Sequence, residues 1–220
     1  MAFNIQPFAI SHSQAIARLH RESILTGFLS RLGPGFLAAL YRSIGRSPYS
    51  KIFVAIDQDS QKVVGFAACS LDTAAMYRHI LLRRGLLFFF LLLPRVFSPG
   101  NIKFIRETLF YPQKYNKIKP IRHGGDDDTP AAAGANTGPC AELLSIAVSD
   151  DSRKKGVGRD LLNALEPYMR KNGVTSYTTV TSSTDRDTNA FYKKCGFYFR
   201  KEVEHHGNVL NEYVKEIRQL

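Results

Sequence analysis

The residues best suited to chemistry lie in one stretch, residues 141–158, with the sequence AELLSIAVSDDSRKKGVG. An apolar segment carries one carboxylate, Glu142, near its start, and a basic loop with Gly156 and Gly158 follows it. The loop leads into a segment with amphipathic helical spacing. Glycines let the backbone approach a ligand closely, and free amides at a helix N-terminus bind anions. This order of parts predicts a cofactor with a diphosphate, bound beside an acid–base group.

Two features of this stretch have a simpler alternative explanation. A GxG sequence before a helix is by itself a common helix start, although the basic triplet Arg153, Lys154 and Lys155 adds charges that can reach phosphates. Strand alternation puts Glu142 on one face with three apolar residues, Leu144, Ile146 and Val148. Desolvation there would raise its pKa toward that of a general base. The alternative is a glutamate in solvent at a strand end, and the residues alone do not decide between the two.

Length and composition predict a single domain over residues 1–220, with 44% hydrophobic residues to form a core. The three cysteines form no CxxC pair and the N-terminus has no export signal, which predicts a cytoplasmic protein without disulfides. The histidines and cysteines lack metal-ligand spacing, so no metal is expected.

The net charge of +11 is concentrated in residues 73–125, where ten Lys or Arg stand against one acid, a local charge of +9. Such a segment faces an anionic substrate, nucleic acid, a membrane surface or only solvent. Nucleic acid is disfavoured because the sequence has no reading helix or stacking motif.

The same segment is unusually apolar. Residues 75–93 have a helical pattern that contains an unbroken apolar run, residues 86–93, and a second helix is expected over 101–109. Because the run is apolar on all sides, we expect it to be buried in the domain or against a second copy in a homodimer. The alternative places it in a lipid interface, flanked by Arg83, Arg84 and Arg95.

The remaining pattern alternates strands and helices with short connections, which predicts a central mixed sheet flanked by helices, an α/β class. A breaker-rich, polar stretch over 123–139 predicts a mobile loop. The expected strands are residues 5–8, 51–56, 63–69, 141–148, 176–181, 198–204 and 209–216, and the expected later helices are residues 157–171 and 188–195.

Two motifs in this order resemble the GNAT superfamily of acetyl-CoA-dependent N-acetyltransferases. RKKGVG, residues 153–158, is similar to the family's Q/R-x-x-G-x-G/A signature, and NAFYKKCGF, residues 189–197, is similar to its second hallmark. The resemblance covers most of the chain and implies the GNAT fold, with a mostly antiparallel sheet. The segment over about 73–122 is then a helical insertion before the cofactor-binding strand, longer than the family's usual connection there.

The resemblance also implies roles at matching positions. Glu142 matches the general base of the family's histone-acetyltransferase branch, and Tyr192 matches the tyrosine that commonly protonates the departing thiolate. The backbone near Ile146 is expected to polarise the acetyl carbonyl. The residues expected to bind acetyl-CoA are Ile146, Ala147, Val148, Arg153, Lys154, Lys155, Gly156, Val157, Gly158, Arg159 and Asn189.

The implied reaction moves an acetyl group from acetyl-CoA to a primary amine by direct attack in a ternary complex. The basic insertion favours a small anionic acceptor, such as an amino-sugar nucleotide, and predicts that the insertion forms a wall of the acceptor site. A protein or peptide amine is one alternative acceptor. A non-catalytic acyl-CoA-binding module at a membrane surface is an alternative of a different class.

Overall fold

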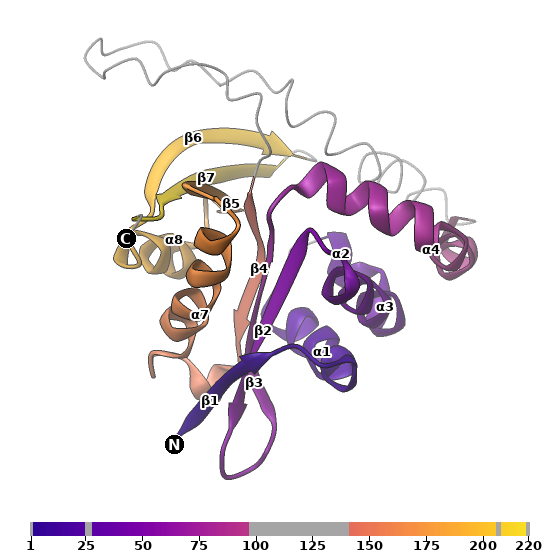
Figure 1. The fold of residues 1–220 in the computed structure, drawn as a ribbon, viewed down its shortest axis with the longest axis horizontal. Coiled ribbons are helices and arrows are strands. Elements are labelled where there is room, and N and C mark those ends of the chain that lie inside the picture. The colour runs from indigo at the N-terminus through magenta and orange to yellow at the C-terminus, as the bar shows by residue number, and fades with distance from the viewer. Residues whose placement is uncertain (1, 25–27, 97–140, 206–207, 219–220) are drawn as a thin grey trace.

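The computed structural model describes residues 2–24, 28–96, 141–205 and 208–218. Within them, seven strands form one sheet in the order β1-β2-β3-β4-β5-β7-β6, with helices on both faces (Figure 1). The β4–β5 pair is parallel and the other pairs are antiparallel, which confirms the mixed, mostly antiparallel sheet. The predicted helix 101–109 and the predicted mobile loop 123–139 lie outside the described residues.

The elements agree with the predicted order. The strands are β1 (Phe3–Pro7), β2 (Ser50–Asp57), β3 (Val63–Ser70), β4 (Glu142–Val148), β5 (Ser176–Ser182), β6 (Tyr198–His205) and β7 (Asn208–Glu216). The α-helices are α1 (Ser13–Ser23), α2 (Phe28–Arg31), α3 (Gly33–Arg46), α4 (Thr73–Val96), α7 (Val157–Lys171) and α8 (Arg186–Lys194), and the short 3₁₀ turns are Ile10–His12 and Asp150–Ser152.

Helices α1, α3 and α4 cover one face of the sheet. Their buried residues recur at helical spacing, so each helix turns one apolar side to the strands. Ile16 of α1, Leu37 of α3 and Met76 of α4 meet Val54 and Phe66 of the sheet, all five with less than 1% of their surface exposed. We call this the α4 face.

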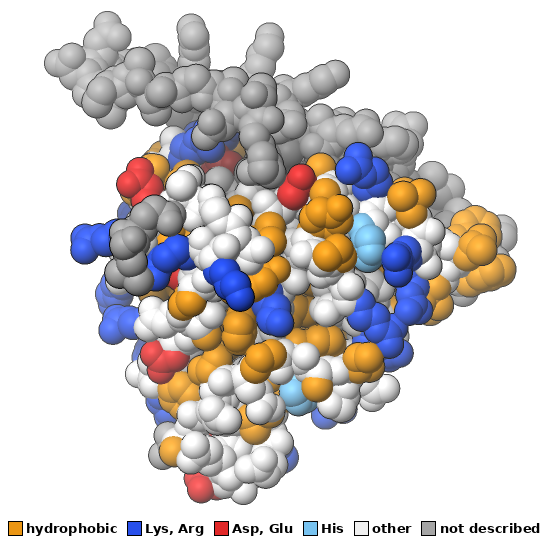
Figure 2. Space-filling model, in the orientation of Figure 1, with side chains coloured by type: hydrophobic (Ala, Val, Ile, Leu, Met, Phe, Trp, Pro, Cys, Tyr) orange, Lys and Arg blue, Asp and Glu red, His pale blue; other side chains and the backbone are white. Residues whose placement is uncertain are grey.

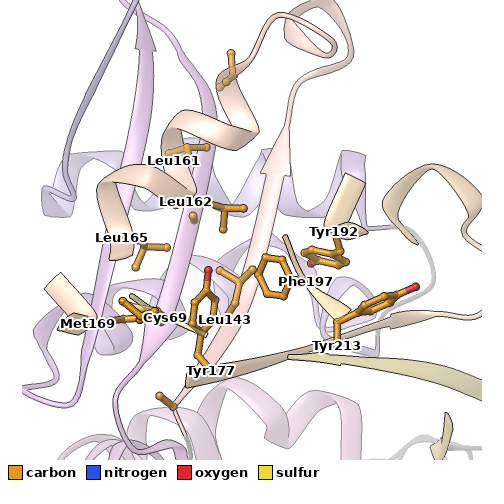
Figure 3. Close-up of a cluster of buried hydrophobic side chains, with 14 of the residues drawn as sticks. Cys69, Leu143, Leu161, Leu162, Leu165, Met169, Tyr177, Tyr192, Phe197 and Tyr213 are labelled. Atoms are coloured by element: carbon orange, nitrogen blue, oxygen red, sulfur yellow. The ribbon is translucent and has the colours of Figure 1, made fainter. Parts of the chain in front are cut away.

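Helices α7 and α8 cover the opposite face, which we call the α7 face. Leu161, Leu162, Leu165 and Met169 of α7 belong to one buried cluster with aromatic residues from the C-terminal part of the chain, as Figure 3 shows. The rings of Tyr192 and Phe197 lie 5.1 Å apart, and those of Tyr192 and Tyr213 lie 5.7 Å apart. These ring contacts fix α8 against β5 and β7.

Strand β4 contains an irregularity that the sequence did not predict. Its register with β3 shifts between the pairs Ala68–Ser145 and Cys69–Leu143, so Leu144 is the extra residue of a β-bulge. The bulge changes the alternation: Leu144 packs with the α4 face, whereas Ile146 and Val148 pack with the α7 face. The prediction that these residues share one face with Glu142 is therefore wrong beyond Leu144.

Helix α4 also differs from expectation in its distal half. Phe88 packs against Phe36 of α3, with ring centroids 5.3 Å apart, but Leu86, Leu87, Phe89 and Phe90 are exposed. The prediction that the apolar run is buried within the domain is wrong for these residues. Helix α4 extends beyond the cover that α3 provides.

Candidate active site

The site is built on a fork between strands β4 and β5. Strand β5 pairs along its full length with β7, but β4 pairs with β5 only at Glu142–Thr178. One side-chain bond crosses just beyond this pair, from the Thr179 hydroxyl to the Leu143 carbonyl oxygen (3.2 Å). Farther along, the β5-facing edge of β4 has no strand partner among the described residues. Buried backbone groups need hydrogen-bond partners, so an open edge of this kind suits a ligand with amides of its own.

Three residues expected to bind the cofactor lie on this open edge. Ile146, Ala147 and Val148 form the end of β4, just before the loop that leads to α7. The bulge at Leu144 precedes them and bends the strand where the fork opens. The structure therefore places these backbone groups beside the opening, while their side chains divide between the two faces.

Glu142 lies at the base of the fork, and its carboxylate is on the α4 face. Its Oε2 atom accepts a hydrogen bond from the Thr73 hydroxyl, the first residue of α4 (3.1 Å). Burial raises the pKa of Glu142 to about 7, the Thr73 hydrogen bond opposes this rise, and the negative charge of Glu212 on β7 adds to it. A carboxyl group with this pKa is well matched to proton transfer near neutral pH.

Thr73 and Glu212 are residues that the sequence analysis missed. Thr73 is 69 positions from Glu142 in the chain, and no local motif connects them. Glu212 is 1% exposed and lies within 3.8 Å of Arg200 and 3.7 Å of Lys201. Both bases belong to β6, so nothing in the sequence around Glu212 indicates that it is buried.

Replacing Thr73 by valine tests the environment of Glu142. The change removes a hydrogen bond that favours the carboxylate, so the pKa of Glu142 should rise further. The acidic limb of the kcat/KM profile should then move to higher pH. Asp72, which accepts from the Ala75 amide at the start of α4, is retained, so the helix start should persist. An unchanged limb would contradict the assignment of that limb to Glu142.

Tyr192 lies on the α7 face, on the other side of the fork. Its hydroxyl is 3.3 Å from the Thr179 hydroxyl, the same group that donates to the Leu143 carbonyl. Burial raises the pKa of Tyr192 to about 12, so the phenol stays protonated at neutral pH. Thr179 therefore links the phenol to the point where β4 and β5 separate.

Asn189 connects three elements near the fork. Its Oδ1 accepts from Asn211 and from the Tyr213 hydroxyl, each at 2.8 Å, and its Nδ2 donates to the carbonyls of Ser182 and Asp185. Both lone pairs and both amide hydrogens are therefore used by the protein. Its predicted contact with the cofactor stays a prediction and requires exchange of one of these bonds.

The glycine loop forms the start of α7. Gly156 has a left-handed backbone with φ of 88° at the N-cap, and Lys154 has φ of 61°. Gly156 is the N-cap of α7, and among the described residues no side-chain hydrogen bond caps the helix there. The first backbone amides of α7 therefore stay available to an anion. A Cβ at Gly158 would lie 3.1 Å from the ring of Phe191, so glycine allows α7 to approach α8 closely. The loop fits a diphosphate.

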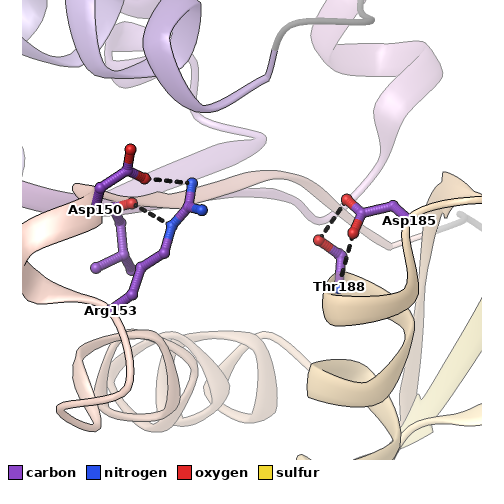
Figure 4. A network of polar contacts seen from close by, with 5 residues as sticks. Asp150, Arg153, Asp185 and Thr188 are labelled. Carbon is purple, nitrogen blue, oxygen red and sulfur yellow. Dashed lines mark hydrogen bonds and ion pairs between the residues drawn. The ribbon is translucent and has the colours of Figure 1, made fainter.

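The basic side chains of the loop are not equally free. Arg153 pairs with Asp150 (3.0 Å) and donates to the Val148 carbonyl (3.3 Å), while Lys155 donates to the Asp151 carbonyl. Figure 4 shows the Arg153 contacts and, separately, the start of α8, where Asp185 accepts from Thr188. The side chain of Val157 is buried in the core, so its predicted contact with the cofactor would be made by its backbone amide.

The structure thus brings most of the predicted residues to one region. Glu142, the end of β4 and the loop around Gly156 follow one another along the fork and its continuation, and Tyr192 borders the fork from α8. Arg159 is placed differently, since it lines a cavity of about 320 Å³ between α7 and α8 with Lys194 and Lys215. Among the described residues, no group of three or more His, Cys, Asp or Glu could hold a metal ion.

Comparisons with known proteins agree with this geometry. Residues 118–197 match the family model described as the acetyltransferase (GNAT) family. A search of curated proteins gives no match. An N-acetyltransferase from Staphylococcus aureus Mu50 is 14% identical, with a TM-score of 0.58, over 99% of this chain and 100% of that chain.

Two further solved structures share the fold. The ribosomal-protein-S18-alanine N-acetyltransferase from Escherichia coli has a TM-score of 0.57 at 12% identity, over 100% of this chain and 96% of that one. PaiA N-acetyltransferase from Thermoplasma acidophilum, solved with coenzyme A, has a TM-score of 0.53 at 15% identity, over 98% and 99%. The match over residues 118–197 includes β4, the glycine loop, α7 and α8, and the fold shared with the solved structures extends over nearly the whole chain. The shared fold confirms the expected fold class, and the match of residues 118–197 to an acetyltransferase family supports an acyltransferase.

Proposed function

We propose that the protein transfers the acetyl group of acetyl-CoA to a primary amine of a small acceptor, by direct attack within a ternary complex. The observation that carries this proposal is the fork with a proton acceptor on one face and a proton donor on the other. Glu142 contacts α4 on one face, and Tyr192 packs with the α7 face. The attacking amine nitrogen loses a proton and the departing thiolate sulfur gains one, so two separate acid–base groups suit the two steps.

Acetyl-CoA supplies a thioester with an electrophilic carbonyl carbon. The open edge of β4 at Ile146–Val148 suits the amide-bearing arm of such a molecule, and the amides at the start of α7 suit its diphosphate. Glu142 takes a proton from the amine, because an ammonium group is not nucleophilic. Tyr192 holds a proton on its hydroxyl and delivers it to the departing sulfur.

The acceptor is proposed to be a small amine that carries an anionic group, such as an amino-sugar nucleotide. The Glu142 carboxylate suits the positively charged amine before it loses its proton. The exposed arginines of α4 bring positive charge to this helix and suit a negative group. The first turns of α4 thus support the predicted wall of the acceptor site.

Turnover with a panel of amines tests the function. Release of free coenzyme A thiol should depend on an added amine, and mass spectrometry should show an N-acetylated product. Amino-sugar nucleotides should react faster than the same amino sugars without phosphate. Binding of acetyl-CoA without turnover on any amine would support the non-catalytic alternative instead.

Lys154→Glu tests the phosphate-binding loop. Gly158→Asp would be expected to abolish cofactor binding, but the contact with Phe191 means that it also disturbs packing. Lys154 is exposed, so reversing its charge should leave the fold intact and weaken acetyl-CoA binding by about tenfold, or about 1.4 kcal/mol. The loss should shrink at high salt.

Titration calorimetry checks this result with two matched variants. Lys154→Gln, which removes the charge without reversing it, should show a smaller loss. Lys171→Glu changes an exposed lysine at the far end of the same helix and should leave affinity unchanged. Equal losses at Lys154 and Lys171 would show a general charge effect and remove support for the loop.

A further inference from the structure

Helix α4 displays an apolar surface that the acetyltransferase site does not use. Leu82, Leu86, Phe89 and Phe90 follow the i, i+4, i+7, i+8 spacing of one helix side. Their exposed fractions are 80%, 77%, 56% and 64%. We call these four residues the α4 stripe. Figure 2 shows orange side chains projecting at the right-hand edge, where the distal half of α4 lies in Figure 1.

The helix that carries the stripe is held firmly at its base. Met76 and Ile80 are buried in the core of the α4 face, and Phe88 packs against Phe36. The stripe therefore projects from a helix anchored on the sheet. Four large apolar side chains on one exposed helix side are more than the scattered exposed residues of an ordinary surface, and such patches mark interaction sites.

Positive charge surrounds the stripe. Helix α4 contains no Asp or Glu, and its arginines Arg78, Arg83 and Arg84 are exposed. Arg78 lies one turn before Leu82 on the same side of the helix. Helix α3 packs against α4 and adds Arg42 and Arg46, and helix α1, which packs against α3, adds Arg18 and Arg21 against the single acid Glu22. Blue side chains border the orange ones in Figure 2.

We infer that the α4 stripe docks the protein on an anionic membrane surface. Leucine and phenylalanine enter the boundary between headgroups and acyl chains, and flanking arginines pair with anionic headgroups. Arginine suits this position because its long stem lies along apolar surface while its charge reaches the phosphates. None of the described helices has the length and hydropathy to cross a bilayer.

Charge complementarity favours the membrane over a second copy of the chain. Two stripes packed face to face would bring the arginines of both copies together, with no acid on α4 to offset them. An anionic lipid surface neutralises these charges and needs no shaped groove to accept a single projecting helix. This inference does not depend on the acetyl-transfer reaction.

Fluorescence gives a direct test, because the sequence contains no tryptophan. Phe90→Trp places a single reporter in the stripe, and Phe199→Trp places a matched reporter at an exposed phenylalanine of β6. Vesicles of phosphatidylcholine mixed with phosphatidylglycerol should shift the Phe90→Trp emission to shorter wavelength, and brominated lipids should quench it. The Phe199→Trp emission should not change, and pure phosphatidylcholine should have a much weaker effect.

Vesicle flotation of the full chain measures the energetics of docking. The triple variant L82S/L86S/F90S should reduce partitioning to the anionic vesicles by at least about a hundredfold, since each change removes several buried carbon groups. R83E/R84E should also release the protein, whereas K62E/K171E, with two exposed lysines changed elsewhere, should bind like wild type. Binding of the wild type should fall as salt rises.

The other occupants of the stripe predict different results. A second copy predicts a wild-type dimer that L82S/L86S/F90S converts to a monomer in the absence of vesicles. If a segment of this chain outside the described residues covers the stripe, the triple variant should have a lower melting temperature and the wild type should not bind vesicles. Either result, or vesicle binding that survives the triple variant, overturns membrane docking.

Discussion

Replacing Glu142 by glutamine should lower the turnover of acetyl-CoA with an amine by about 10²–10⁴-fold, the usual contribution of a general base. Glutamine keeps the shape of the side chain and can still accept a hydrogen bond from Thr73, so only the proton acceptor is lost. Affinity for acetyl-CoA should stay close to wild type, because Glu142 lies at the base of the fork, away from the start of α7.

The pH profile identifies the group that is lost. In wild type, kcat/KM should rise with pH through about 7, where Glu142 loses its proton, and this limb should be absent in Glu142→Gln. The profile should be measured with two acceptor amines of different basicity. A limb that belongs to Glu142 stays at the same pH with both amines, whereas a limb that belongs to the amine moves. If the limb persists in the variant, Glu142 is not the base.

Protein stability distinguishes this result from misfolding. The folded pKa of Glu142 is about 7, above its ordinary value of 4.5, so the folded state holds the proton more tightly. The stability from this preference is complete below about pH 4.5 and is lost as pH rises through about 7. Glu142→Gln, which stays neutral, should therefore be at least as stable as wild type at pH 8.

A matched control shows that the effect belongs to this carboxylate. Glu166 on α7 is half-buried and contacts Lys215 (2.6 Å) and the Tyr177 hydroxyl (3.0 Å). Glu166→Gln should lower stability, because it weakens an ion pair, and should leave turnover near wild type. A comparable loss of turnover in both variants would indicate a structural effect.

The parts of the site that could be predicted are those with local signatures. The loop at Gly156 and the helix after it follow from glycine, charge and helical spacing within a few residues. Strand–helix alternation likewise predicted the order of strands and helices along the chain. The hydrogen bond from Thr73 to Glu142 could not be predicted, because it joins distant positions and depends on where α4 packs.

Two errors have specific physical causes. The bulge at Leu144 adds one residue to a regular alternation, and a run of apolar residues gives no sign of where such a residue sits. The apolar run of α4 indicated burial, but burial depends on whether a neighbour is long enough to cover the helix. Among the described side chains of this run, Phe88 forms a ring pair with α3. The sequence therefore indicated correctly that the run is apolar, but not which of its residues α3 covers.

Replacing Tyr192 by phenylalanine should also slow the chemical step by about 10²–10⁴-fold. The ring is buried against Phe197 and Tyr213, and phenylalanine preserves those contacts. Only the hydroxyl near Thr179 is lost, so the fold and the affinity for acetyl-CoA should remain. The slower step follows because the sulfur would depart without a proton from the protein.

Single-turnover measurements are the proper test, since slow product release can hide a change in chemistry. Tyr177→Phe is the matched control: this buried tyrosine packs against the same Phe197 ring, but its hydroxyl donates to Glu166 and not toward the fork. It should lose some stability and keep its single-turnover rate. If Tyr192→Phe retains the full rate in the same experiment, the proton comes from elsewhere, and water at the fork becomes the next donor to test.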